Sequence, residues 1–160
     1  MFGIFKKTVE VVAPISGKVA NLAAVPDPVF ADKVVGDGVA IDEINSDIVC
    51  APVDGIVSLV FPTNHAFVIT TKNDIEVLVH IGIETVGLGD GIFERLVEEG
   101  KTVKTGESVI RFKLDLLKNL GCALISPVVI TTPDKIAKIE GNIGNMVVAG
   151  QDVIFSYKPR

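Results

Sequence analysis

Apolar and polar side chains alternate along short stretches of the chain, and this alternation predicts β-strands. Residues 75–80 are the clearest case. Ile75, Val77 and Val79 fall on one face of the predicted strand, and Glu76, Leu78 and His80 fall on the other. Successive side chains of a strand point to opposite faces. The pattern therefore predicts a strand that is buried on one side and carries His80 on the other.

Two more strands are predicted just before this one. Residues 55–60 and 66–70 are apolar and rich in β-branched side chains, and the turn-forming residues 61–64 separate them. A second turn between residues 70 and 76 would fold the strand at 66–70 back against the strand at 75–80. Consecutive strands joined by a short turn pair antiparallel, so the three segments are expected to form one meander.

Turn motifs recur elsewhere in the chain. Residues 12–19 and 50–57 share the pattern x-Ala-Pro-x-x-Gly-x-Val, in which Pro and Gly supply turn chemistry between short strands. A Gly beside a polar residue also precedes an apolar stretch at 35–39, 104–110 and 149–154. These motifs indicate that much of the chain consists of short strands separated by turns.

Helical spacing is confined to two short segments. Residues 92–99 have the spacing of a short amphipathic helix that ends at Gly100, and residues 134–139 follow a Thr-Pro pair of the kind that begins a helix. Both segments are too short to organise the fold. We therefore expect an all-β protein, an antiparallel β-sandwich or barrel-like fold with a few short helices.

Composition agrees with a single β-rich domain. The 160 residues include 25 Val and 18 Ile but only 10 Leu, and β-branched side chains favour strands over helices. One domain over residues 1–160 is expected, with residues 1–8 as a flexible N-terminal segment. The two cysteines, Cys50 and Cys122, lack the spacing of a redox or metal motif and are expected to be reduced and to fill space in the core.

Several classes of protein are disfavoured. No uncharged stretch is long and apolar enough for a transmembrane helix, and the N-terminal residues lack the features of a signal peptide, so we expect a cytoplasmic protein. The net charge of −5, with 15 basic and 20 acidic residues spread along the chain, does not indicate binding to nucleic acid. Residues 100–102 read Gly-Lys-Thr, but position 95 is Arg where a phosphate-binding P-loop requires Gly.

The chain has only two histidines, and the predicted meander brings them together. Around a turn centred near residue 73, positions whose numbers add up to about 146 face each other, and His65 with His80 misses this value by one. Paired imidazoles can bind zinc, act as base and nucleophile, or carry a phosphoryl group on one ring while the other steadies its oxygens. The spacing leaves these three uses open.

The residues around the two histidines belong to a longer pattern. Residues 25–31, 35–41, 51–55, 63–67 and 79–86 resemble, in order and with few gaps, the glucose-type IIA component of the bacterial phosphoenolpyruvate-dependent sugar phosphotransferase system. The similarity continues through residues 98–100 and 126–130. It implies an antiparallel β-sandwich with a shallow active-site depression, and the role of a phosphoryl carrier in sugar uptake and phosphorylation.

The resemblance also implies roles for particular residues. His80 matches the phosphorylated histidine, with Nε2 as the nucleophile, and His65 matches a second histidine that hydrogen-bonds the phosphoryl oxygens. Thr63 matches the threonine that orients this second ring. The site would be surrounded by an apolar ring of partner-binding residues with two acidic residues at its rim, namely Val29, Phe30, Phe61 and Leu78 with Asp27 and Glu84.

Partners follow from the same resemblance. The donor would be the phosphorylated small carrier HPr, and the acceptor a cysteine on the IIB domain of a sugar permease, which the protein would reach transiently at the membrane. Regulatory targets of the unphosphorylated form are also implied. No cofactor is required for transfer, and zinc between His65 and His80 would be an incidental or regulatory ligand.

Two other functions compete with this one. In the first, the histidines belong to a zinc site of a hydrolase or of an interface, completed by Asp27 or Glu84. In the second, the chain is a binding module, because the Ala-Pro-x-x-Gly repeats resemble lipoyl and biotinyl domains. Those domains require a lysine in the hairpin turn between the repeat halves, and neither repeat presents one convincingly.

Overall fold

Antiparallel strands make up most of the protein, as the sequence predicts. The structure, a computed structural model, describes residues 7–88 and 91–160, so most of the N-terminal segment predicted at 1–8 lies outside the described residues. The strands are β1 (Val9–Val12), β2 (Gly17–Asn21), β3 (Asp37–Asp42), β4 (Ile48–Cys50), β5 (Gly55–Val60), β6 (Ala66–Thr70), β7 (Glu76–His80), β8 (Phe93–Arg95), β9 (Thr102–Val103), β10 (Ser108–Phe112), β11 (Ser126–Ile130), β12 (Ile136–Gly141), β13 (Met146–Val147) and β14 (Val153–Pro159).

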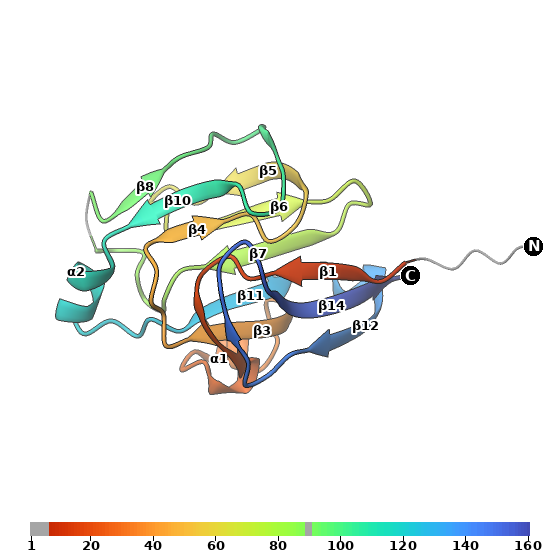
Figure 1. The fold of residues 1–160 in the computed structure, drawn as a ribbon, viewed down its shortest axis with the longest axis horizontal. Coiled ribbons are helices and arrows are strands. Elements are labelled where there is room, and N and C mark those ends of the chain that lie inside the picture. The colour runs from red at the N-terminus through yellow and green to blue at the C-terminus, as the bar shows by residue number, and fades with distance from the viewer. Residues whose placement is uncertain (1–6, 89–90) are drawn as a thin grey trace, which may run out of the picture.

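The strands form two layers. One layer is an eight-stranded sheet with the order β13-β2-β3-β11-β7-β6-β5-β9, and the other consists of two three-stranded sheets, β1-β14-β12 and β4-β10-β8. Figure 1 shows the two small sheets side by side over the larger one. The first and last strands are neighbours, since Val9 is paired with Tyr157. The expected sandwich is therefore confirmed.

The main core lies between the layers, and strand alternation explains which side chains enter it. Val77 and Val79 of β7 belong to this core, together with side chains from both small sheets such as Phe112 and Phe155. Leu78, between the two valines, belongs instead to a second cluster on the outer face of the large sheet. The two-residue period of the sequence thus assigns the faces of β7 correctly.

The second cluster is covered by short helical segments. The 3₁₀ helix η1 (Leu22–Ala24) and helix α1 (Pro28–Ala31) contribute Leu22 and Phe30 to it. Asp27 caps α1, because its carboxylate accepts a hydrogen bond of 3.1 Å from the Val29 N–H, and Pro28 occupies the first helical position. This outer cluster lies next to the histidines, since its residue Phe30 contacts His80.

The two Ala-Pro-x-x-Gly repeats lie against each other. The Val12 N–H donates to the Pro52 carbonyl, and the Cys50 N–H donates to the Pro14 carbonyl, at 2.9 and 2.8 Å. Their glycines also share a function, since a Cβ added to either Gly17 or Gly55 would come within about 2.4 Å of a carbonyl oxygen on the next strand. The repeats are therefore two equivalent crossings of the chain between the layers. Cys50 is buried and Cys122 is partly buried, both as free thiols.

The helix predicted at residues 92–99 is wrong. Phe93–Arg95 form strand β8, which pairs antiparallel with β10, and Phe93 stacks on Phe112 at a ring-centroid distance of 6.2 Å. A segment of eight residues is shorter than a helix that is stable by itself, so pairing with the edge of β10 prevails. Gly100 ends this segment as expected, with a φ of 91°, but it does so in a turn toward β9.

The helix predicted at residues 134–139 is also largely wrong. The Thr-Pro pair does start a helix, but the 3₁₀ helix η2 (Pro133–Lys135) lasts one turn before the chain enters strand β12. β12 pairs with β14 at the edge of a small sheet, which satisfies its backbone. The sequence interpretation also omits α1 and helix α2 (Leu114–Asn119), of which only Leu117 is buried.

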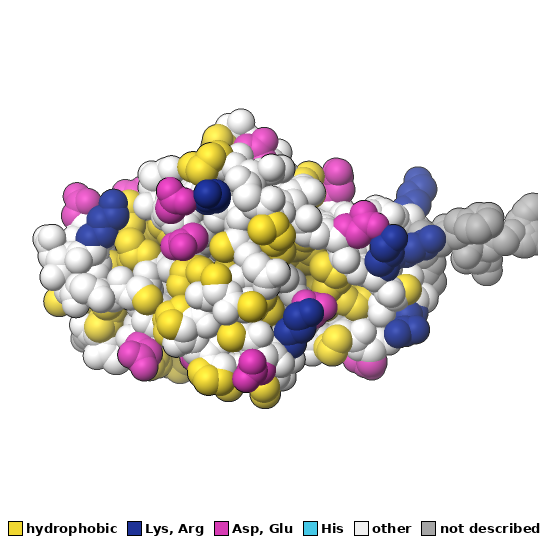
Figure 2. Space-filling model, turned by 90° about the horizontal axis from the view of Figure 1, so that it is seen from below, with side chains coloured by type: hydrophobic (Ala, Val, Ile, Leu, Met, Phe, Trp, Pro, Cys, Tyr) yellow, Lys and Arg dark blue, Asp and Glu magenta, His cyan; other side chains and the backbone are white. Residues whose placement is uncertain are grey.

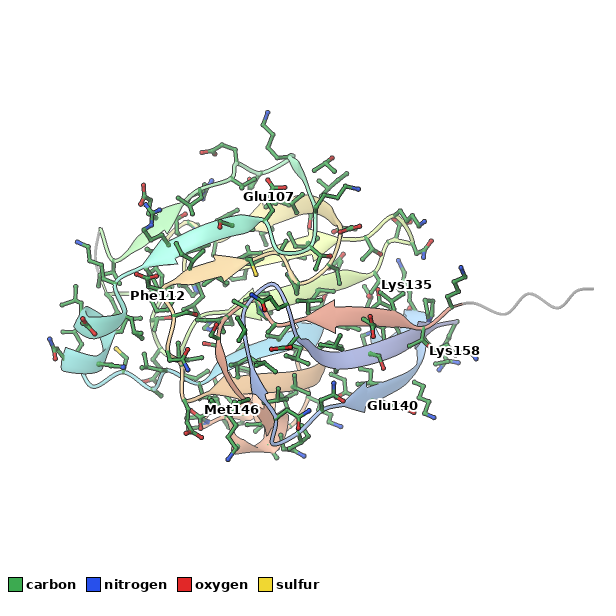
Figure 3. All side chains as sticks on the ribbon, viewed as in Figure 1. Glu107, Phe112, Lys135, Glu140, Met146 and Lys158 are labelled. Carbon is green, nitrogen blue, oxygen red and sulfur yellow. The ribbon has the colours of Figure 1, made fainter. Side chains whose placement is uncertain are left out.

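Basic side chains gather at one end of the molecule. Figure 2 shows Lys and Arg near the start of the described chain, and Figure 3 labels Lys135 and Lys158 at this end. Lys7, Lys72, Lys135 and Arg160 line a hollow there. Lys72 lies in the turn between β6 and β7, at the opposite end of the hairpin from His80. No helix among the described residues is long and apolar enough to cross a membrane.

Candidate active site

The β6–β7 hairpin brings the two histidines together, in the register that the turn near residue 73 predicts. Ala66 is the direct partner of His80, and His65 lies just before β6. The preceding residue, Asn64, has a φ of 61°, which takes the backbone out of the strand conformation. The strict alternation of side chains therefore does not apply to His65, and its ring is free to turn toward His80.

The two rings are neighbours. Their centroids are 5.0 Å apart, and their planes are nearly perpendicular, at 80°. The Ile81 N–H donates to the His65 carbonyl at 2.8 Å, which continues the pairing of the hairpin past the end of β6. The predicted pairing of the histidines in space is confirmed.

His80 is anchored through one of its ring nitrogens. Its Nδ1 lies 2.7 Å from the Gly82 carbonyl, an acceptor, so Nδ1 carries the proton of the neutral ring and Nε2 keeps a lone pair. Gly82 is held in turn by Ser126, whose Oγ accepts from the Gly82 N–H at 3.0 Å and donates to the Leu124 carbonyl at 2.8 Å. Ser126 is fully buried.

His65 is anchored by the residue that the sequence analysis assigned to it. Thr63 Oγ1 lies 2.6 Å from Nδ1 of His65. His65 is buried, with 2% of its surface exposed. When the Thr63 hydroxyl donates to Nδ1, the proton of the neutral ring resides on Nε2, and this nitrogen becomes a donor.

Burial keeps both rings neutral near pH 7. It lowers the pKa of His65 from 6.5 to about 4, with a smaller contribution from the neighbouring His80. Burial also lowers the pKa of His80, against the opposing effects of its hydrogen bond to Gly82 and of the Asp27 carboxylate. A neutral imidazole has a lone pair with which to attack, whereas an imidazolium has none.

Two of the four predicted apolar residues, Phe30 and Phe61, contact the histidine rings. Phe30 contacts His80 at a ring-centroid distance of 5.1 Å, and Phe61 contacts His65 edge-on at 5.3 Å. Phe30 and Leu78 are buried in the outer cluster. Phe61 is partly buried, and Val29 is exposed beside Phe30. Each histidine ring is therefore in contact with a phenylalanine side chain, Phe30 at His80 and Phe61 at His65.

The two predicted rim carboxylates differ in their surroundings. Asp27 acts on His80 electrostatically and caps α1 at the same time. Glu84 is exposed and has a φ of 59°, in the loop that leaves β7. In the described parts of the chain, no three His, Cys, Asp or Glu side chains are grouped closely enough to hold a metal ion. Neither Asp27 nor Glu84 therefore forms a three-residue group of this kind with the two histidines.

Four residues that support the site were missed by the sequence analysis. Gly82 and Ser126 hold His80, and Asn64 shapes the turn before His65. Arg95 reaches this turn from β8, because its Nε donates to Asn64 Oδ1 at 3.0 Å. Only Asn64 carried a local signal, since Asn tolerates a positive φ in turns. Gly82 lies two residues after His80, whereas Ser126 and Arg95 act across long separations in the sequence.

Comparisons with known proteins point to one family. Residues 9–136 match the family described as phosphoenolpyruvate-dependent sugar phosphotransferase system, EIIA 1. The glucose-specific EIIA component of Haemophilus influenzae is 45% identical over 150 residues, which cover 94% of this chain and 89% of that protein. The glucose-specific EIIA component of Bacillus cereus is 43% identical over 152 residues, or 94% of this chain and 92% of the relative.

Two further proteins extend the comparison. The N-acetylglucosamine-specific EIICBA component of Klebsiella pneumoniae is 45% identical over 153 residues, which cover 95% of this chain but only 23% of that longer protein. The solved structure of glucose permease IIA from Mycoplasma capricolum matches with a TM-score of 0.85 and 33% identity, over 97% of this chain and 99% of that one. This chain belongs to the EIIA 1 family of the phosphoenolpyruvate-dependent sugar phosphotransferase system.

Proposed function

We propose that the protein is a glucose-type phosphoryl carrier that holds the phosphoryl group on Nε2 of His80. The donor is the phosphohistidine of HPr, and the acceptor is a cysteine on the IIB domain of a sugar permease. The observation that carries this proposal is the anchoring of His80 Nδ1 on the Gly82 carbonyl at 2.7 Å, which leaves Nε2 with the lone pair. Membership of the family supports the reaction class.

The chemistry requires little from the protein beyond positioning. The Nε2 lone pair forms an N–P bond while the N–P bond of the donor breaks, and the electron pair of that bond returns to the donor's imidazole. The ring of His80 becomes more positive as it takes the phosphoryl group. The Gly82 carbonyl stabilises this charge through the Nδ1 proton, and Asp27 adds a smaller electrostatic contribution.

His65 has a different role in the proposal. With Thr63 donating to its Nδ1, the ring offers an Nε2–H donor to the phosphoryl oxygens, at a ring-centroid distance of 5.0 Å from His80. Its low pKa keeps this ring neutral. Because Nε2 carries the proton, it has no lone pair there with which to compete with His80 for the phosphoryl group. The apolar ring around the site limits attack of water on the N–P bond.

The surface around the site suits transient partners. An apolar ring with Asp27 and Glu84 at its rim favours docking of apolar surfaces flanked by positive charge, where electrostatics increase the association rate. The basic end near Lys72 lies away from the site and does not oppose such partners. We place this exchange in the cytoplasm, with brief contact to the membrane through the permease, and propose that it needs no metal or organic cofactor.

A phosphorylation assay tests the proposal. The protein is incubated with phosphoenolpyruvate, the first enzyme of the system and HPr, and the labelled residue is mapped by mass spectrometry. We expect one acid-labile phosphate on His80 in the wild type, none in His80→Ala, and no change on addition of a chelator. Labelling of His80→Ala at another residue, or absence of labelling in the wild type, would contradict the assignment.

The variant His65→Gln separates the two histidines. It keeps the nucleophile but alters the group that holds the phosphoryl oxygens, so it should still accept phosphate on His80 and pass it poorly to the IIB domain. Normal transfer from His65→Gln to the IIB domain would show that His65 does not steady the phosphoryl group.

A further inference from the structure

The turn that carries Thr63 and His65 is braced by a residue from a different sheet. Arg95 ends β8 in the small sheet β4-β10-β8, whereas the turn connects β5 to β6 in the large sheet. The Arg95 Nε donates to Asn64 Oδ1 at 3.0 Å, and the Asn64 amide lies 3.5 Å from the Phe93 carbonyl of the same β8 strand. The Asn64 side chain is thus bound to β8 through both its amide oxygen and its amide nitrogen.

Asn64, the residue that Arg95 holds, sets the direction in which the His65 side chain leaves the backbone. Asn64 has a φ of 61°, a conformation that costs free energy for residues other than Gly. Its own N–H donates to the Phe61 carbonyl at 2.7 Å, so the turn is closed on the hairpin side as well. A hydrogen bond from a charged donor such as Arg95 is stronger than one from a neutral donor.

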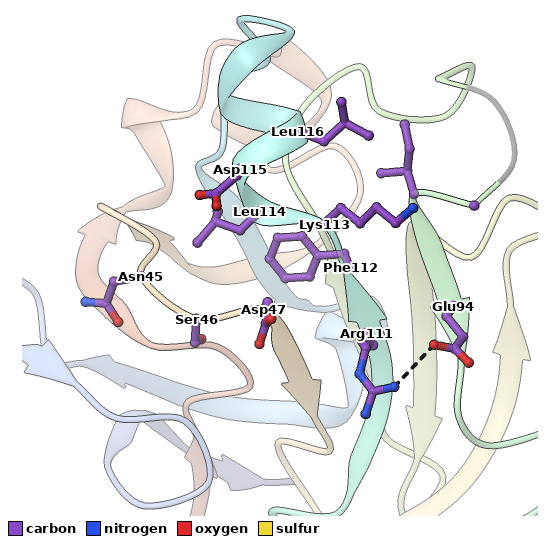
Figure 4. A pocket seen from close by; sticks show the side chains of 12 residues that line it. Asn45, Ser46, Asp47, Glu94, Arg111, Phe112, Lys113, Leu114, Asp115 and Leu116 are labelled. Atoms are coloured by element: carbon purple, nitrogen blue, oxygen red, sulfur yellow. Dashed lines mark hydrogen bonds and ion pairs between the residues drawn. The ribbon is translucent and has the colours of Figure 1, made fainter.

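The Arg95 guanidinium is held at two points, by Asn64 and by Glu98. Its side chain is 25% exposed, and its Nη1 is 3.5 Å from the exposed carboxylate of Glu98. The guanidinium is planar, so the contact to Glu98 and the contact to Asn64 constrain one rigid group. The neighbouring strand β10 carries a contrasting arginine, Arg111, which is 56% exposed and paired only with Glu94 among the contacts described, at 3.4 Å (Figure 4).

We propose that Arg95 is a positioning residue for phosphoryl transfer, acting through Asn64 to hold the Thr63–His65 pair in the orientation that presents Nε2–H of His65 to the phosphoryl group. This inference rests on the proposed function of the site. Arg95 touches no reacting atom in this account. It fixes the turn, the turn fixes the 2.6 Å contact between Thr63 and His65, and that contact selects the tautomer of His65.

The main test replaces Arg95 with Met, which removes the donor and keeps a similar length of side chain. A displacement of about 1 Å in a catalytic group can cost about 100-fold in rate, and a loosened turn would be displaced for part of the time. We therefore expect Arg95→Met to pass phosphate to the IIB domain about tenfold more slowly. The matched control is Arg111→Met, which removes an arginine from the adjacent strand of the same sheet and should leave the rate unchanged.

The second readout is the protonation of His65, which a purely structural role would not change. In ¹⁵N spectra of the wild type we expect His65 to carry its proton on Nε2. In Arg95→Met we expect a mixture of the Nε2–H and Nδ1–H forms, because the hydrogen bond from Thr63 is weakened. Phosphate should still be found on His80 alone.

A second variant keeps the test decisive if Arg95→Met folds poorly. Asn64→Gly preserves the positive φ and removes the amide that Arg95 holds, so it should show the same loss of rate and the same change at His65. The double variant should be about as slow as either single variant, rather than about 100-fold slower, because both remove one interaction. The stability of each variant is measured by urea unfolding, alongside its rate of phosphate transfer to the IIB domain.

The possible outcomes separate this inference from the proposed function. If the wild type is not phosphorylated, the phosphoryl-carrier assignment fails. If the wild type transfers phosphate and both Arg95→Met and Asn64→Gly match Arg111→Met in rate and in the His65 spectrum, the positioning role is overturned and the carrier assignment stands. A slow Arg95→Met beside a normal Asn64→Gly also overturns it, since the effect would not pass through Asn64.

Discussion

Burial of His65 makes the stability of the protein depend on pH between about pH 4 and pH 6.5. The pKa of His65 is about 4 in the folded protein, against 6.5 for an unperturbed histidine. Below pH 6.5 the unfolded chain binds a proton at this residue while the folded protein does not. The contribution of His65 is therefore complete above pH 6.5 and is lost as the pH falls through about 4.

The size of the effect follows from the two pKa values. Each unit of difference corresponds to about 1.4 kcal/mol, so neutral His65 adds about 3 kcal/mol to the free energy of unfolding at pH 7 relative to pH 4. Between pH 6 and pH 4.5 the free energy of unfolding should fall by about 1–1.4 kcal/mol per pH unit from this residue alone. That is a large part of the 5–15 kcal/mol, roughly, that stabilises a typical domain.

Urea unfolding at a series of pH values measures this dependence. The chain has no Trp, so unfolding is followed by far-ultraviolet circular dichroism. The comparison is between the wild type and His65→Gln, which cannot take up the proton but retains every carboxylate that titrates in the same range. We expect the stabilities of the two proteins to approach each other by about 2–3 kcal/mol between pH 7 and pH 4.5. Parallel curves would refute the reasoning.

Three further predictions test the surroundings of the site and the core. Asp27→Asn should lower the pKa of His80, seen by NMR titration, because it removes a charge that raises this pKa and keeps a capping side chain; an unchanged or raised value would contradict this. Gly82→Ala should cost about 1–3 kcal/mol in urea unfolding, because φ is 69° and the new Cβ would lie 2.9 Å from the Ala123 carbonyl. Phe67→Ala, at a fully buried position, should cost about 3–5 kcal/mol in the same assay, and a loss below about 1 kcal/mol would be inconsistent with the core described.

The parts of the fold that the sequence predicted correctly are those specified by local patterns. The faces of β7 follow from alternation between Val77 and Leu78, and the meander follows from turn residues between apolar stretches. The register of the hairpin was also predicted correctly, since the numbers of the paired residues Ala66 and His80 add up to 146. His65 lies one position outside this pairing, after the left-handed conformation of Asn64, which no strand pattern records.

The errors and omissions share a physical cause. The spacing of residues 92–99 suits a helix locally, but the free edge of β10 offers backbone partners that no local pattern records. The same holds for the bond from Arg95 to Asn64 and for the hydrogen bond from Gly82 to Ser126, which join residues far apart in the sequence. The two histidines were recognisable from family resemblance, whereas Arg95 and Ser126, which hold the turns beside them, required the structure.

The pairing of the first strand with the last has a consequence for synthesis of the protein on the ribosome. β1 pairs with β14, whose residues are made about 150 positions later, and at about 5–20 residues per second this takes roughly 7–30 seconds. The β6–β7 hairpin that carries the histidines needs only its own turn and can form within microseconds of emerging. Until β14 has been synthesised, β1 lacks its pairing partner and the core between the layers lacks the side chains that β14 supplies, such as Phe155.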